Sequence, residues 1–289
     1  ITVWRFRLRK GDDPNEIPDQ SHGNPLIEVG LIVLSAAMLV VIAVPTLKGI
    51  AYMKNDPVED YEGEAIEVIV TGYQWWWNFE YPELGIKTSN EFNIPVGRPV
   101  KLVLKSADVI HSFWVPKLAG KTDLIPGQIN HMWIEADEPG MYWGQCAEFC
   151  GDSHAYMLFR TIAMEQEAFD AWVEHQRSAP VEPVETAAIT GKKLFTEKGC
   201  IGCHMVGSVG GVVGPDLTHF GSRATLAAGW QENTIENLRE WIQYPEKVKP
   251  GNLMYLGVGT MAGIKQIREE KGLSDEEVAD LADYLHTLK

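Results

Sequence analysis

The chain has 289 residues, of which 45% are hydrophobic, and a formal net charge of -15. That length is sufficient for two modest domains with cores of their own, and so negative a charge excludes a nucleic acid as an expected partner. The charge is uneven, because residues 1–54 carry six basic and five acidic side chains, so the remainder has a net charge of -16. An acidic outer part suits basic partner proteins, although it also serves solubility alone.

An apolar segment near the N-terminus predicts a membrane helix. Residues 26–47 are almost wholly apolar, with Glu28 as the single charge. At about 1.5 Å per residue, a segment of this length spans the ~30 Å hydrocarbon core of a bilayer. We therefore expect a transmembrane helix over about residues 26–50, inside a membrane anchor that comprises residues 1–54.

Residues 1–10 begin apolar and end in a basic cluster. They are typical of the last turn of an earlier hydrophobic segment, followed by a cytoplasmic loop under the positive-inside rule. We therefore expect a helical hairpin whose first helix is largely missing, with the chain beyond about residue 50 on the outer face.

The middle of the chain predicts a β domain. Apolar and polar residues alternate in 64–73 and again in 99–109, and turns rich in Gly and Pro separate such runs. Strands at this spacing predict a sandwich or a small barrel, over residues 63–176. The domain is expected to end in a short amphipathic helix, residues 165–176.

The last third of the chain predicts a separate helical domain. Residues 177–186 are rich in Pro and Glu and lack apolar periodicity, which is typical of an extended linker. Helical periodicity returns in residues 187–289. Ser274 and Glu277 have the spacing of a capping box, which predicts the start of the last helix.

Four potential metal ligands lie close together in the segment WGQCAEFCGDSHAYM, residues 143–157. Copper accepts thiolate, thioether and imidazole ligands, whereas the methionine argues against a zinc site. One thiolate with one histidine and an axial methionine would suit a single copper ion. Two thiolates three residues apart favour bridging sulfurs that hold two copper ions, and a disulfide is the remaining alternative. The four residues follow the pattern C-x3-C-x3-H-x2-M: Cys146, Cys150, His154 and Met157.

A two-copper centre needs a second imidazole from another part of the chain. The candidate is His111, which follows a strand-like run and precedes a turn proline. His131 is the competitor, although its neighbours predict the interior of a strand.

These motifs resemble the dinuclear copper (CuA) domain of cytochrome c oxidase subunit II. The resemblance rests on C-x3-C-x3-H-x2-M after G-x-Y-x-G, with HSFWVP upstream. It implies a cupredoxin-like β-barrel in which Cys146 and Cys150 bridge the coppers. It also implies terminal ligands His111 and His154, a weak axial ligand Met157, and a backbone carbonyl ligand from Glu148. The Glu148 side chain would reach a Mg²⁺ ion at the junction with subunit I.

The same resemblance gives two further residues a role. In the aromatic run GYQWWWNFEY, residues 72–81, it implies that Trp75 accepts electrons, with Trp76 as the alternative; core packing is the plainer interpretation of such a run. Glu28 would feed the proton pathway into subunit I. A charged residue near a helix start is, however, often only exposed to water at the membrane interface.

A second cysteine pair lies in GCIGCH, residues 199–204, which carries the C-x-x-C-H signature of covalent haem c attachment. Cys200 and Cys203 would form the thioethers, and His204 would bind the iron. Redox dithiols and zinc ribbons share C-x-x-C, but a second zinc-like pair is missing from the sequence. The motif predicts an all-α class I cytochrome c domain.

The sixth iron ligand is expected to be a methionine, which raises the reduction potential. Met254, in P-G-x-x-M, is favoured over Met261. The weaker candidates are His219 and His286, while Pro215 and Trp241 are expected near the haem.

The order of anchor, copper domain, linker and haem domain resembles subunit II of caa-type cytochrome c oxidases. It implies an electron-delivery subunit of a proton-pumping respiratory oxidase, which passes electrons from haem c to CuA and then to haem a of subunit I. Expected partners are subunit I, further oxidase subunits, the membrane, and a cytochrome c, another high-potential carrier or an upstream complex as donor. The expected location is the bacterial inner membrane, with both metal domains on the periplasmic face.

Two rival interpretations remain at this point. One is a nitric-oxide- or nitrous-oxide-reducing enzyme that also contains a CuA module. The other is a membrane-tethered electron carrier or copper-delivery protein without a catalytic partner.

Overall fold

The computed structural model describes residues 1–7, 9–13, 15–17, 23–54, 65–255 and 272–289. The chain divides into two compact units, Ile1–Asn55 and Asp56–Lys289.

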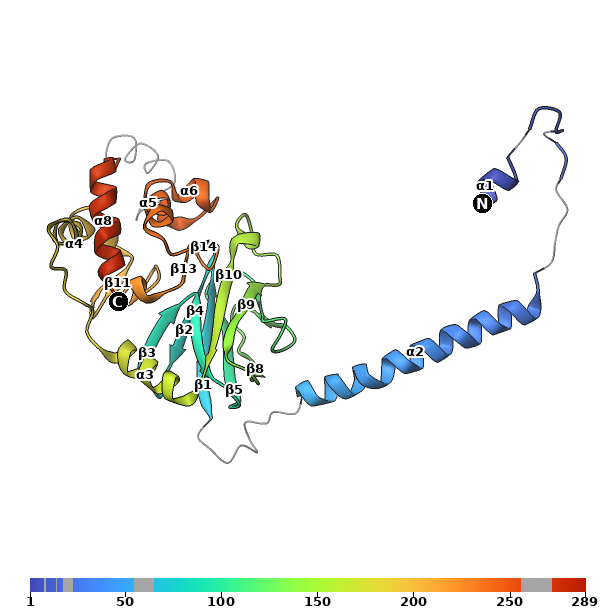
Figure 1. Cartoon of the computed structure of the whole chain (residues 1–289), viewed down its shortest axis with the longest axis horizontal. Coiled ribbons are helices and arrows are strands. Elements are labelled where there is room, and N and C mark those ends of the chain that lie inside the picture. Colours follow the sequence, from blue (N-terminus) through green and yellow to red (C-terminus); the bar gives the residue numbers. More distant parts are fainter. Residues whose placement is uncertain (8, 14, 18–22, 55–64, 256–271) are drawn as a thin grey trace. The chain divides into compact units, whose positions relative to one another are not determined.

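The first unit contains a one-turn helix, α1 (Thr2–Arg5), and a long helix, α2 (Pro25–Lys54) (Figure 1). The Asn24 side chain accepts a hydrogen bond from the Leu26 backbone N–H and so caps the start of α2. No residue of α2 is buried within the unit, and among the described helices α2 is the one long and apolar enough to cross a membrane. The predicted apolar helix is therefore present, as Pro25–Lys54, and its crossing of a membrane stays a prediction.

The second unit begins with a β-sandwich of two five-stranded sheets (Figure 1). The first sheet has the order β3 (Ile86–Ser89), β2 (Trp76–Tyr81), β1 (Ile66–Tyr73), β5 (Val100–Ser106), β8 (Asn130–Ile134). The second has the order β4 (Glu91–Pro95), β10 (Leu158–Met164), β9 (Gly140–Cys146), β6 (His111–Trp114), β7 (Thr122–Leu124). The β1–β5 and β4–β10 pairs are parallel and the other pairs are antiparallel. The predicted cupredoxin-like fold is confirmed.

Large aromatic side chains fill the space between the two sheets. Burial alternates along β1, as expected for a strand with one face on a core. Each fully buried ring contributes roughly 1.5–3 kcal/mol relative to an exposed one. The central rings are Trp77, Phe79, Phe92, Phe113 and Phe159.

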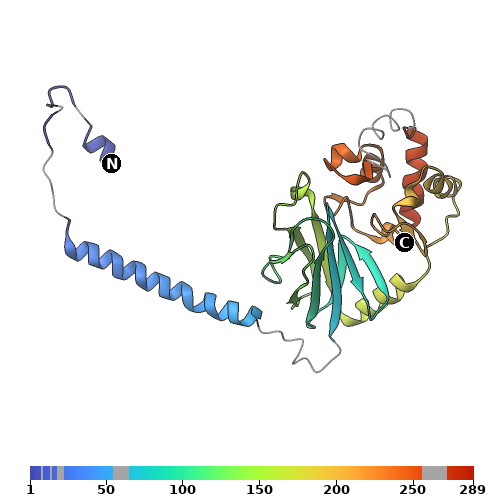
Figure 2. The same cartoon turned by 180° about the vertical axis from the view of Figure 1, so that it is seen from behind.

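The helix α3 (Gln166–Arg177) follows the last strand and lies beside β3 and β4 (Figure 2). It buries Phe169 and Val173, one helical turn apart, as the predicted amphipathic helix requires. The described residues 178–185 then form neither helix nor strand.

The C-terminal part of this unit has its own hydrophobic core, built mainly from helices. These are α4 (Thr186–Glu197), α5 (Ile235–Gln243), α6 (Pro245–Val248) and α8 (Asp275–Thr287), with short 3-10 turns η2 (Cys200–Gly202), η3 (Phe220–Ser222) and η4 (Leu253–Tyr255). Two small hairpins, β11–β12 (Met205–Val206, Val209–Gly210) and β13–β14 (Thr225–Leu226, Gln231–Glu232), are additions that periodicity did not predict.

Helices α4 and α8 pack closely because Gly191 has no side chain. A Cβ atom at that position would lie 1.9 Å from the Asp280 carbonyl oxygen. The capping box predicted from Ser274 and Glu277 is present at the start of α8.

Candidate metal centre and haem-attachment site

The end of β9 and the start of β6 bring the candidate copper ligands together. Cys146 is the last residue of β9 and pairs in register with Phe113 of β6, two residues beyond His111. The Ala147 N–H donates to the Ser112 carbonyl oxygen at 2.9 Å and fixes the start of the following loop. That loop ends in the 3-10 turn η1 (His154–Tyr156).

The two cysteine sulfurs lie 3.7 Å apart and form the centre of the cluster. His111 Nδ1 is 3.9 Å from Cys146 Sγ, and His154 Nδ1 is 3.6 Å from Cys150 Sγ. Met157 Sδ lies 3.8 Å from Cys150 Sγ. Five soft or borderline donors therefore surround one small volume, as a copper centre requires.

The cluster is largely protected from solvent. Both cysteines, His111 and Met157 are buried, whereas His154 lies at the rim. His111, Cys146 and Cys150 offer ligand atoms within 4.8 Å of one another. Both cysteines are free thiols, so a disulfide between them is not formed.

The two cysteine thiols lie within hydrogen-bond reach of each other. The hydrogen bond between them lowers the pKa of Cys146 to about 4 and raises the pKa of Cys150, because a negative charge on one sulfur opposes ionisation of the other. Thiolates are the form that binds metal, so a first deprotonation is easy and metal would drive the second.

Asp108 orients His111 from behind. His111 Nε2–H donates to Asp108 Oδ1 at 2.8 Å, which leaves Nδ1 facing Cys146. Burial opposes protonation of His111, but the bonds to Asp108 and Cys146 outweigh it and raise its pKa. Gly72 makes room for this ring, since a Cβ there would lie 2.9 Å from His111 Cδ2. A ligand histidine held by a carboxylate is a common second-sphere arrangement.

Trp75 touches the cluster through the backbone of a cysteine. Its indole Nε1–H donates to the Cys150 carbonyl oxygen at 2.9 Å, and Gln74 Nε2 donates to the same oxygen at 2.7 Å. The neighbouring Trp76 instead stacks on Tyr73, with 4.4 Å between ring centroids. Of the two tryptophans, Trp75 is the one joined to the ligand loop.

Glu148 lies beside the candidate copper ligands, whereas His131 does not. The Glu148 carbonyl oxygen lies 3.3 Å from Cys146 Sγ, while its side chain is exposed. His131 lies exposed on β8, in register with Val103 of the first sheet, and is not part of the cluster. The geometry therefore favours His111 over His131 as the second imidazole.

The C-x-x-C-H segment forms the turn η2 and its continuation. Cys200 and Cys203 are partly buried free thiols, and His204 Nδ1–H donates to the Pro215 carbonyl oxygen at 2.8 Å. That bond leaves Nε2 for a haem iron. Burial lowers the pKa of His204, which favours the neutral imidazole that binds metal. Gly214 lies against the ring, where a Cβ would be 2.8 Å from Cε1.

The candidates for the sixth iron ligand differ in their surroundings. Met254 lies in η4 with 42% of its surface exposed, and Met261 lies outside the described residues. His219 Nε2 and His286 Nε2 lie 3.2 and 3.3 Å from the carbonyl oxygens of Gln176 and Asn233. Trp241 packs on the core of this region.

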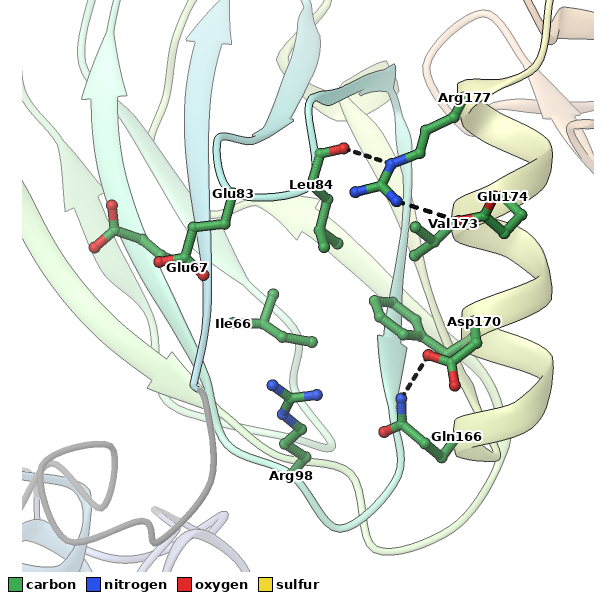
Figure 3. A pocket seen from close by; sticks show the side chains of 11 residues that line it. Ile66, Glu67, Glu83, Leu84, Arg98, Gln166, Asp170, Val173, Glu174 and Arg177 are labelled. Carbon is green, nitrogen blue, oxygen red and sulfur yellow. Dashed lines mark hydrogen bonds and ion pairs between the residues drawn. The ribbon is translucent and has the colours of Figure 1, made fainter.

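A pocket of about 360 Å³ lies at the other end of the sandwich and belongs to neither site. Figure 3 shows the Arg98 side chain directed into it, beside Ile66 at the start of β1 and Gln166 of α3. The His111 ring of the candidate copper cluster lies against Gly72, near the other end of β1 and roughly 20 Å from Ile66 at 3.3 Å per residue.

Comparison with known proteins now bears on this geometry. Residues 83–165 match the model of the periplasmic domain of cytochrome c oxidase subunit II, and residues 188–289 match that of cytochrome c. Cytochrome c oxidase subunit 2 of Alkalihalophilus pseudofirmus is 43% identical over 100% of this chain and 80% of its own length. The chain belongs to the cytochrome c oxidase subunit 2 family.

Two further relatives extend the comparison. Cytochrome c oxidase subunit 2 of Bacillus sp. (strain PS3) is 36% identical over 98% of this chain and 80% of its own length. Quinol oxidase subunit 2 of Bacillus cereus is 35% identical over 62% of this chain and 62% of its own length.

Membership of the family confirms several predictions. The chain is a subunit II with a fused cytochrome c domain, and it functions as a subunit of an oxidoreductase complex with other oxidase subunits as partners. The two matched domains support a CuA copper centre and a haem c. Soft donors around Cys146 and Cys150, and a free Nε2 on His204, fit those groups.

Two residues of the copper cluster were missed by sequence reasoning. Asp108 stands three residues before His111, and that short spacing between a carboxylate and a candidate ligand was the available signal. Gly72 opens the aromatic run, but only the fold brings it against His111.

Proposed function

We propose that this chain carries electrons from an external donor to the oxygen-reducing subunit of a respiratory cytochrome c oxidase. The observation that supports this most strongly is the cluster of two thiolates, two imidazoles and a thioether at the end of the sandwich. When bound, a copper pair there would exchange one electron at a time with little change of geometry.

The copper pair would be held by five side chains and one carbonyl oxygen. Cys146 and Cys150 would supply the two thiolates, and the carbonyl oxygen of Glu148 would supply a further contact. His111 and His154 would supply imidazole ligands, and Met157 would supply a thioether ligand. Asp108 keeps His111 in the tautomer whose Nδ1 faces the metal.

The haem would be fixed by Cys200 and Cys203 through thioether bonds, with His204 as the proximal iron ligand. The Pro215 carbonyl oxygen orients that imidazole. Met254 is our choice for the sixth ligand because it stands in the P-G-x-x-M pattern that resembles the axial loop of class I cytochromes c.

Electrons would reach the chain at the haem domain and leave it through the copper cluster toward haem a of subunit I. The donor is a cytochrome c, another high-potential carrier or an upstream complex. Trp75 accepts electrons on the way to the cluster, because its indole is hydrogen-bonded to the backbone of Cys150.

The remaining parts of the proposal concern the membrane and the neighbouring subunit. Helix α2 would cross the bacterial inner membrane, with both metal domains on the periplasmic face and Glu28 feeding a proton pathway of subunit I. The exposed Glu148 carboxylate would bind Mg²⁺ at the junction with subunit I.

The test is the metal and haem content of the purified complex, with optical and EPR spectra. We expect two coppers and one haem c assigned to this chain. Cys150→Ser should lose the copper signal and keep the haem, whereas Cys203→Ser should lose a thioether bond and keep the copper, so each variant controls the other. A full copper signal in Cys150→Ser would contradict the ligand assignment.

A further inference from the structure

Trp75 is covered by the haem domain of the same chain. Only 8% of its surface is exposed, although a residue that receives electrons from a separate protein would need an open face. The backbone of Gly251 approaches the ring so closely that a Cβ there would lie 3.1 Å from Trp75 Cη2. Gly251 has φ +73°, which favours glycine and permits this approach. The backbone of the haem domain at Gly251 therefore packs directly against the Trp75 ring.

Lys249 joins the two domains directly beside this contact. Its side chain is buried, and Nζ donates to the carbonyl oxygens of Trp75 at 2.5 Å and Tyr156 at 3.0 Å, both in the copper domain. The third bond goes to Ala227 of its own domain at 3.2 Å. An ammonium group has three donors, and all three are satisfied.

Burying an amine is costly unless its donors are satisfied. Burial lowers the pKa of Lys249 to about 7. The hydrogen bonds to three carbonyl oxygens offset part of the cost of burying the amine. A methionine at this position would fill similar space but leave three carbonyl oxygens without their donor. Lys249 is thus specific to the docked arrangement of the two domains.

A second set of contacts holds the same two domains from another side. The buried Glu91 carboxylate, on β4, accepts hydrogen bonds from the backbone N–H groups of Ala224 and Thr225 at 3.1 and 2.7 Å. Arg160 Nη2 donates to the Gly229 carbonyl oxygen at 2.7 Å. These bonds use charged side chains of the copper domain and backbone groups of the haem domain.

Further contacts lie between these two sets. The Leu158 N–H donates to the Ala228 carbonyl oxygen at 3.0 Å, and the Ser153 hydroxyl donates to that of Pro250. The rings of Tyr156 and Trp230 meet edge to face, with 4.4 Å between centroids. Backbone, polar and aromatic contacts together define one continuous interface.

We propose that Lys249 and Glu91 clamp the haem domain over Trp75, so that the chain's own haem domain permanently occupies the face through which electrons reach the copper cluster. This rests on the proposed function. Lys249 and Glu91 are positioning residues, because neither touches a candidate metal ligand side chain in the described contacts. The step moves one electron from the haem iron, which is oxidised, to the copper pair, which is reduced, with no bond made or broken.

A fixed domain and a mobile tethered domain make different kinetic predictions. In a clamped domain, electron transfer from haem c to copper needs no docking step, so its rate does not depend on solvent viscosity. In an unclamped domain the linker alone returns the haem to the copper face, and the rate falls as viscosity rises. An external donor reaches only the haem domain in the first case.

The experiment compares the intact oxidase with Lys249→Met and Glu91→Gln. The matched control is Lys247→Met, because Lys247 is an exposed lysine of α6, two residues before Lys249, and its ion pair with Glu240 lies at the surface. The internal rate is followed by the copper absorption after rapid photoreduction of haem c, at several glycerol concentrations. Hydrogen–deuterium exchange of residues 156–160 and 224–229 reports the interface without depending on activity.

In the parent and in Lys247→Met we expect a viscosity-independent rate and slow exchange. In Lys249→Met the rate should fall about tenfold, the scale of losing one charge-assisted hydrogen bond, and become viscosity-dependent, while copper and haem content and the KM for the donor stay unchanged. Exchange of both segments should become faster. Glu91→Gln should likewise lower the electron-transfer rate and speed up exchange. If Lys249→Met fails to assemble, Glu91→Gln alone tests the clamp.

If the rate of electron transfer from haem c to copper already falls with viscosity in the parent, the clamp is overturned. Faster hydrogen–deuterium exchange in Lys249→Met with an unchanged electron-transfer rate would also overturn it. A parent complex in which haem c never reduces copper would instead overturn the proposed function itself. The two failures are therefore distinguishable.

Discussion

At the scale of single residues, the carboxylate of Asp108 connects the ligand histidine to the tryptophan segment. It accepts a hydrogen bond from His111 Nε2 and another from the Gln74 N–H at 2.7 Å, directly before Trp75. One side chain thus holds both the ligand imidazole and the start of the tryptophan segment. Burial raises the pKa of Asp108, but these bonds outweigh that effect and lower it, so the group is ionised.

Asp108→Asn should weaken copper binding without unfolding the sandwich. Loss of the carboxylate behind a ligand histidine lowers metal affinity about tenfold to a hundredfold. Copper retained after dialysis against graded chelator measures this effect. Asp137→Asn, at an exposed acid, is the control and should retain copper like the parent. Equal retention in both variants would show that His111 needs no orienting carboxylate.

Met254→Ala should abolish the far-red sulfur-to-iron absorption band of the oxidised haem c and lower its potential, because the proposed thioether ligand is lost. Met261→Ala is the natural comparison and should leave the band intact. The opposite pattern would assign the sixth position to Met261.

Residues that carry motifs were predictable from the sequence, while residues that act through the fold were not. Cys146, Cys150, His154 and Met157 share one loop, so their spacing alone brought them to attention. Lys249 shows the limit, because its three partners lie in segments far from it in the sequence. Its significance appears only when the two domains meet.

At the scale of elements, α8 shows how local sequence fixes a helix start. Ser274 accepts a hydrogen bond from the Glu277 N–H at 3.2 Å, and Glu277 accepts one from the Ser274 N–H at 3.0 Å. Periodicity and capping predicted this helix because both are local properties. The hairpins β11–β12 and β13–β14 are only two residues per strand, too short for any alternating pattern to show.

Ser274→Ala should lower the free energy of unfolding of the haem domain by about 1 kcal/mol, the usual cost of an N-cap. Chemical denaturation followed by haem absorption measures it. Ser208→Ala, at an exposed turn serine, should have no effect. A Ser274→Ala variant as stable as the parent would mean that α8 is held by its packing on α4 alone.

Glu277→Gln should remove a pH-dependent part of that stability. Lys198 and the Ser274 N–H lower the pKa of Glu277, so the folded carboxylate is favoured. Its contribution is complete above the pKa of the unfolded carboxyl group and is lost as pH falls through the lower folded value. The parent should therefore be more stable than Glu277→Gln at neutral pH, and the difference should vanish in acid. A difference that persists in acid would contradict the electrostatic cause.

At the scale of the whole molecule, the chain joins a long apolar helix, a sandwich and a haem domain in one order. The fold of each part was predicted because hydrophobic period, turn residues and ligand motifs agree within each segment. The contacts between sandwich and haem domain were not predicted, because interface residues follow no sequence period. Burial of Trp75 by Gly251 is the clearest example.

Glu28→Gln should slow steady-state oxygen reduction by a factor of several and leave the copper and haem spectra unchanged, because the proposed role is in proton uptake. Oxygen consumption by the reconstituted complex measures the rate. Ser35→Ala, in the same helix, is the control. Unchanged turnover in Glu28→Gln would refute the role.

The link between the sandwich and the haem domain, residues 178–185, is neither helix nor strand and has a consequence for engineering. Its start is fixed because Arg177 Nε donates to the Leu84 carbonyl oxygen at 2.8 Å, and its end enters α4. Lengthening such a loop is cheap, since each doubling costs about 0.6 kcal/mol. A foreign cytochrome could therefore be grafted at this junction without harm to the sandwich. It would exchange electrons rapidly only if it also brought a buried cation and two adjacent backbone N–H groups to match the vacated surface.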